Sequence, residues 1–76
     1  MTARPGRATE RPRAVTRRQR EVLVLRAEGL TAKQIAQQLW VTEHTVKEHI
    51  KEINRVLLAR NSTHAVTIGF RTGLLA

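Results

Sequence analysis

Apolar residues between positions 46 and 57 recur with the period of an α-helix. Four of them follow one another at spacings of four, three and four: Val46, Ile50, Ile53 and Leu57. This spacing is typical of a helix with one buried face. The opposite side is polar and mostly basic, with His44, Lys47, Glu48, Lys51 and Arg55. We therefore predict an amphipathic helix over about residues 43–58, which would span about 24 Å at 1.5 Å per residue.

A shorter helix is predicted just before it. Thr31 has the character of an N-cap, and Gln34, three residues later, completes a capping-box pattern. The buried edge of this helix would consist of Ile35, Ala36 and Leu39. Trp40 and Val41 would form a turn, and Thr42 would cap the longer helix. A short helix, a tight turn and a longer basic helix together predict a helix-turn-helix.

Two further helices flank this pair. The first is predicted to begin at Thr16, with Gln19 in a capping box, and to end at Gly29 in a left-handed cap. The last is predicted from Asn61 to about Thr72, after which the two following leucines fold back. Its apolar residues are Ala65, Val66, Ile68 and Phe70. Because this is more apolar surface than one small core needs, we expect a second face to meet a partner subunit.

The pattern predicts an all-α fold, a compact four-helix bundle containing a helix-turn-helix, over residues 15–76. Residues 1–14 carry four arginines, both prolines and almost nothing that could be buried, so a disordered basic arm is predicted there. Such an arm could follow the DNA backbone or reach into a minor groove. It could equally be a solvated tail or the remnant of a linker.

Composition narrows the class of protein. A formal net charge of +8 and a pI near 11.8 indicate a polyanionic partner, usually nucleic acid. The chain has no cysteine, no apolar run that could cross a membrane and no signal peptide, so we expect a cytoplasmic protein without membrane contact. The three histidines offer no shared metal site, because the two on the basic helix lie about 140° apart. They are His44, His49 and His64. We expect neither catalysis nor a metal or cofactor.

Four segments make the chain similar to a known family. They read TRRQREVL at 16–23, AEGLTAKQIAQQL at 27–39, VTEHTVKEHI at 41–50 and ARNSTHAV at 59–66. In order and spacing they resemble the LuxR/GerE (NarL-type) DNA-binding domain over nearly the whole of residues 15–75. The resemblance implies a four-helix domain that binds double-stranded DNA, places its third helix in the major groove and regulates transcription as a dimer on an inverted repeat.

The same resemblance assigns roles to individual residues. Base contacts would come from Lys47, Glu48 and Lys51. Sugar–phosphate contacts would come from Thr31, Lys33, Thr45 and His49, and charge alone adds Arg60 to this group. The homodimer contact of the fourth helix would involve Thr63, Val66 and Thr67. The chemistry agrees with the base contacts, because lysine can donate to guanine O6 and N7 and glutamate can accept from cytosine N4.

The sequence departs from the family at two positions. Relatives commonly have glycine where this chain has Trp40, and a tryptophan would be strained if the turn needs a positive φ. We expect Trp40 to be partly buried and to fill a gap. The alternative is a remodelled turn with the indole over the domain surface or against DNA or a partner. At Glu48 relatives often have a small apolar residue, so this acid is a candidate for determining sequence specificity.

Two other functions remain open from the sequence. One is a sigma-like module that binds RNA polymerase, since promoter-recognition regions share the helix-turn-helix. The other is a general basic nucleic-acid binder, although the near absence of aromatic residues argues against stacked single strands. There is no receiver domain and no domain for a small-molecule ligand, so the chain is either a small one-domain regulator, as its basic arm favours, or part of a longer one.

Overall fold

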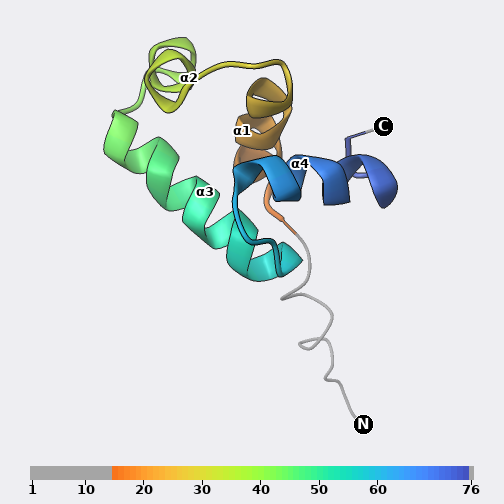
Figure 1. Cartoon of the computed structure of the whole chain (residues 1–76). Helices are drawn as coiled ribbons and strands as arrows, with labels where there is room; N and C mark the ends of the chain where they lie inside the picture. The colour runs from red at the N-terminus through yellow and green to blue at the C-terminus, as the bar shows by residue number, and fades with distance from the viewer. Residues whose placement is uncertain (1–14, 76) are drawn as a thin grey trace, which may run out of the picture.

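The structure, a computed structural model, describes residues 15–75, which form four α-helices (Figure 1). The helices are α1 (Arg17–Ala27), α2 (Ala32–Leu39), α3 (Glu43–Leu57) and α4 (Ser62–Arg71). No strand occurs among these described residues, which confirms the predicted all-α class. The predicted arm, residues 1–14, lies outside them.

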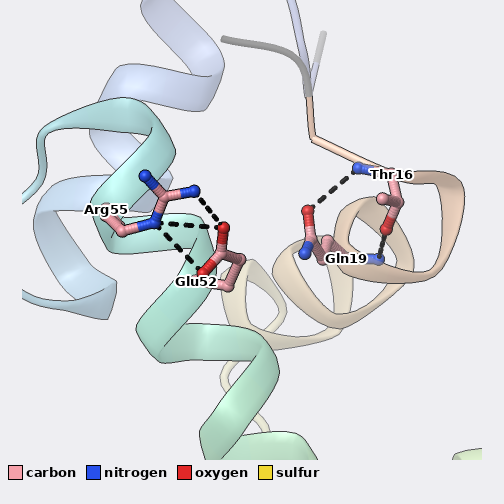
Figure 2. A network of polar contacts seen from close by, with 4 residues as sticks. All are labelled: Thr16, Gln19, Glu52 and Arg55. Carbon is pink, nitrogen blue, oxygen red and sulfur yellow. Dashed lines mark hydrogen bonds and ion pairs between the residues drawn. The ribbon is translucent and has the colours of Figure 1, made fainter. Parts of the chain in front are cut away.

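Each helix begins at its predicted N-cap. The Thr16 hydroxyl accepts from the Gln19 N–H at 3.0 Å, and the Gln19 side chain accepts from the Thr16 N–H at 3.0 Å (Figure 2). An equivalent capping box opens α2. Thr42 and Asn61 cap α3 and α4 through single side-chain acceptors. Each such cap stabilises a helix by about 1 kcal/mol because it satisfies a backbone donor that the helix leaves unpaired.

The end of α1 follows the predicted glycine cap. Gly29 has φ 97°, which only glycine adopts without strain. The N–H of Leu30 donates to the Leu25 carbonyl at 3.2 Å, and that of Gly29 donates to the Arg26 carbonyl at 3.0 Å. These two bonds form a Schellman motif and turn the chain sharply toward α2.

The turn between α2 and α3 corrects the prediction for Trp40. This residue adopts the left-handed conformation, with φ 60° and ψ 42°, so the turn is not remodelled. The side chain is 93% exposed, and the expected partly buried indole is therefore wrong. The reason is tertiary packing, because Leu39 and Val41 on either side already pack against the core and leave no room there for the indole.

The core draws on all four helices. Its fully buried apolar residues are Val22, Leu23, Ile35, Ala36, Val46, Ile53 and Ala65. The predicted apolar face of α3 is confirmed, since Val46 and Ile53 are buried while Ile50 and Leu57 are half-buried against the same cluster. This packing fixes the rotation of α3 about its axis and so decides which side chains face outward.

The helices α2 and α4 lie at different ends of the domain. Both pack against α1 and α3, but they do not contact each other. Figure 1 shows α2 beside the beginning of α3, whereas the chain enters α4 from the end of α3. A partner that binds at α2 therefore leaves α4 free to bind a second partner.

After α4 the chain folds back, as predicted. The Leu75 N–H donates to the Gly69 carbonyl at 3.0 Å. From α1, the Arg20 guanidinium donates to the Leu74 carbonyl at 3.0 Å. Both leucines pack against the core, so this short tail is part of the fold.

Candidate nucleic-acid interface

The outward face of α3 is free of the other helices. The predicted polar residues on this face are all exposed: His44, Lys47, Glu48, Lys51 and Arg55. Four of them, all but Lys47, succeed one another at spacings of four, three and four and so form a straight row along the helix. The core packing on the opposite side holds this row in one orientation.

Ion pairs within α3 restrain two of its cations. The Lys47 ammonium lies 3.5 Å from the Glu43 carboxylate, four residues earlier. The Arg55 guanidinium donates to both carboxylate oxygens of Glu52 (Figure 2). Among the described residues, no carboxylate forms an ion pair with Lys51. Of the cations on this face, Lys51 is therefore the one that an anion could meet without displacing an internal partner.

The Glu52–Arg55 pair changes how both groups hold their protons. Hydrogen bonds from the Arg55 side chain, with the attraction of its charge, lower the pKa of the Glu52 carboxyl below its ordinary value. The same bonds raise the pKa of Arg55. Arg55 is exposed and the Glu52 side chain is also open to solvent in large part, so the effect on stability is small. The pair matters more for the interface, because it adds a carboxylate beside the basic row.

The beginning of α3 offers hydrogen-bond donors. The Thr42 hydroxyl accepts from the Thr45 N–H at 3.0 Å, and the two hydroxyl oxygens lie 2.9 Å apart. The first N–H groups of a helix have no partner within the helix, and the helix dipole makes this end positive. Together these features suit a phosphate oxygen.

The residues predicted to contact sugar–phosphate groups fall into three places. Thr31 and Lys33 are exposed at the beginning of α2. Thr45 and His49 are half-buried and lie four residues apart, on the flank of α3 opposite Lys47. Arg60 is exposed but lies beyond the far end of α3, where its N–H donates to the His64 ring nitrogen Nδ1 at 3.0 Å. The structure thus places two of these residues at the beginning of α2, two along α3 and Arg60 beyond the far end of α3.

The predicted dimer residues share one face of α4. Thr63 and Thr67 are exposed and Val66 is half-buried. Phe70, 57% exposed, extends this face by another turn, because it lies four residues after Val66. The sequence analysis counted Phe70 among the apolar residues of the helix but did not assign it to the dimer contact. Its spacing from Val66 and Thr63 was the signal that could have found it.

Three further observations concern metal ions, membranes and hollows within residues 15–75. No three His, Asp or Glu residues gather there in a way that could hold a metal ion. None of the described helices is long and apolar enough to cross a membrane. A hollow of about 560 Å³ is an open groove lined mostly by apolar side chains between the end of α3 and the end of α4.

Comparison with known proteins agrees with this geometry. Residues 13–68 match the family described as bacterial regulatory proteins, luxR family. The uncharacterized transcriptional regulatory protein YxjL of Bacillus subtilis is 38% identical over 68 residues, covering 90% of this chain and 31% of the relative. The transcriptional activator protein SolR of Ralstonia solanacearum is 38% identical over 71 residues, covering 93% and 30%.

A third relative, the transcriptional regulatory protein YdfI of Bacillus subtilis, is 44% identical over 59 residues, covering 75% of this chain and 28% of the relative. The chain thus spans about a third of the length of these relatives. All three are described as regulators of transcription rather than as enzymes. Because the family matches most of the helical region, the chain belongs to the luxR family of bacterial regulatory proteins.

Proposed function

We propose that this chain binds double-stranded DNA in a sequence-specific manner and regulates transcription, with α3 in the major groove. The observation that carries the proposal is the outward face of α3, which is exposed, mostly basic and fixed in orientation by the buried Val46 and Ile53. An α-helix fits the width of the major groove. The family and the regulatory names of the relatives support the same function.

Within this proposal Lys47, Glu48 and Lys51 read base edges. Lysine donates to guanine, and the Glu48 carboxylate accepts from a cytosine amino group. Two residues at the beginning of α2 and two in the first half of α3 hold the sugar–phosphate backbone and so set the register of α3 on the duplex. They are Thr31, Lys33, Thr45 and His49. Arg60 lies beyond the other end of α3, so it would contact a phosphate at a different part of the duplex from the four residues above.

We further propose a homodimer through α4 that binds an inverted repeat. The supporting observation is one face of α4, a helix that does not contact α2: Thr63, Thr67 and Phe70 are exposed there, and Val66 is half-buried between them. A twofold arrangement would place two copies of α3 in successive major grooves, about 34 Å apart. We place this activity in the cytoplasm, with the DNA, and RNA polymerase is a candidate partner because one relative is described as an activator.

Selection from a random duplex pool at one fixed salt concentration tests the base-reading proposal. Salt must be constant because phosphate-driven affinity falls steeply as salt rises. The wild type is compared with Lys47→Ala/Lys51→Ala. A matched control, Arg17→Ala/Arg18→Ala, removes the same number of positive charges from α1, which lies outside the proposed interface.

We expect the wild type and the α1 control to enrich an inverted repeat and the α3 variant to enrich none. If all three bind without enriching any sequence, the chain is a general cationic binder. A pull-down of RNA polymerase in the absence of DNA, equal for all three proteins, would instead favour a polymerase-bound module.

A further inference from the structure

Trp40 combines two features that do not favour folding. Its backbone is left-handed, with φ 60°, a conformation that is unfavourable for large L side chains. Its indole is 93% exposed, so almost no apolar area is withdrawn from water. The position would be served better by glycine. A strained backbone that carries an exposed aromatic side chain is characteristic of a functional surface.

We propose that the indole of Trp40 packs against the sugar–phosphate backbone at the rim of the major groove that receives α3. This inference rests on the proposed function. Trp40 stands two residues before Thr42, the cap of α3, and two residues of chain span at most about 7 Å. A helix about 10–12 Å wide fills a groove about 12 Å wide. The chain that leads into α3 must therefore cross the rim, where sugars and phosphates lie.

The chemistry of the side chain suits this place. Indole has an apolar body that can cover a deoxyribose and one N–H that can donate to a phosphate oxygen. The hydroxyls of Thr42, which caps α3, and of Thr45, in its first turn, lie at the positive end of that helix. Trp40 would extend this group of phosphate-binding donors by one aromatic contact.

Electrostatics around the turn favour DNA over a protein partner. The helix before the turn, α2, has no acidic residue and carries Lys33. The first acid after the turn, Glu43, is offset by Lys47 at 3.5 Å. The whole chain has a formal net charge of +8. A phosphate can therefore approach Trp40 without meeting an uncompensated carboxylate on either adjoining helix end.

Trp40 also makes the test direct, because the chain has one tryptophan and no tyrosine. The full chain is titrated with an end-labelled duplex of mixed sequence, about 30 base pairs or three helical turns long. The fluorescence anisotropy of the label reports DNA binding. The wavelength of tryptophan emission and its quenching by acrylamide report whether the indole is shielded from solvent. The salt concentration is kept near 50 mM, where phosphate contacts are strong.

Leu58 supplies a matched control. It is also left-handed, with φ 58°, and 85% exposed, but it caps the opposite end of α3. Trp40→Gly and Leu58→Gly therefore make the same kind of backbone change at the two ends of one helix. Trp40→Phe keeps the aromatic body and removes the N–H, which separates packing from hydrogen bonding.

We expect DNA to shift the wild-type emission to the blue and to protect the indole from acrylamide. Trp40→Gly should bind DNA roughly tenfold more weakly, the size typical of one aromatic interface contact, with an unchanged or higher Tm. Trp40→Phe should recover most of the affinity, and Leu58→Gly should bind as the wild type does.

The inference is overturned if anisotropy reports binding while emission and quenching stay constant. Equal losses for Trp40→Gly and Leu58→Gly would also overturn it, since they would reflect helix ends in general. Emission that changes with protein concentration in the absence of DNA would assign the indole to a protein contact instead. If anisotropy reports no binding at all, the proposed function itself fails, and the Trp40 contact fails with it.

Discussion

Leu75 occupies the space that a side chain at Gly69 would need. A Cβ at position 69 would lie 2.8 Å from both Cγ and Cδ1 of Leu75, closer than such atoms approach in proteins. The two residues are also joined through the backbone, because the Leu75 N–H donates to the Gly69 carbonyl. The end of the chain is therefore seated on α4 at the point where the helix has no side chain.

Gly69→Ala should have opposite effects in two backgrounds. In the wild type the new methyl displaces Leu75, and the lost packing should outweigh the better helix propensity and destabilise the domain by about 1 kcal/mol. In Leu75→Ala the space is open, so the same change should stabilise by about 1 kcal/mol. Urea unfolding of the four proteins measures both values. The same sign in both backgrounds would contradict the contact.

Glu48 should determine specificity while it lowers general affinity. Glu48→Ala removes a negative charge from the face proposed to meet DNA, so binding to mixed-sequence duplex should strengthen. Discrimination at one base pair should fall by about 1–3 kcal/mol, because the carboxylate no longer accepts from cytosine. Competition binding against a panel of single-base variants of the selected site measures both effects.

Glu28→Ala is the charge-matched control for Glu48→Ala. Glu28 is exposed at the end of α1, and its loss changes the net charge by the same amount. It should leave discrimination intact. Equal behaviour of the two variants would remove Glu48 from the base-reading group and leave only a charge effect.

Glu52→Gln should weaken the ion pair with Arg55 and remove a pH-dependent contribution to stability. Arg55 lowers the pKa of Glu52 in the folded chain, so the ionised Glu52 carboxylate stabilises the fold at neutral pH. This stabilisation is lost as pH falls through the lowered pKa. The wild type should therefore be slightly more stable than Glu52→Gln at pH 7, and the urea midpoints should converge in acid. A difference that persists or grows on acidification would contradict this origin.

The same substitution should strengthen DNA binding. The freed Arg55 can neutralise one more phosphate, so the slope of log affinity against log salt should steepen by up to about one. Titrations at several salt concentrations measure it. An unchanged slope would place Arg55 outside the interface.

Phe70→Ser should separate dimerisation from folding. The side chain is 57% exposed in one copy, so its loss should change the unfolding free energy of the monomer by less than about 1 kcal/mol. If α4 forms the dimer, sedimentation at micromolar concentration should show a shift toward monomer, both with and without DNA. Leu58→Ser, another exposed apolar residue, is the control and should not shift the mass. A wild type that is monomeric under both conditions would refute the dimer.

Local chemistry made much of this fold readable from the sequence. Thr16, Thr31, Thr42 and Asn61 act on backbone groups within three residues, so their caps follow from sequence order alone. The apolar period of α3 likewise fixes which side is buried, and hence which side is available as a site, because one helix has one rotation relative to its core. The pairing of Glu43 with Lys47 could also have been read from their spacing of four.

Tertiary packing decided the remainder. Whether Trp40 is buried depends on how Leu39 and Val41 fill the space beside it, which no local pattern encodes. The contact between Gly69 and Leu75 and the bond from Arg20 to Leu74, 54 residues apart, exist only after α1 and α4 have packed. Sequence alone therefore determined the helices, their caps and the polar face of α3. Only the packed structure decided which apolar side chains remain outside, because a small core can bury only those that its neighbours leave room for.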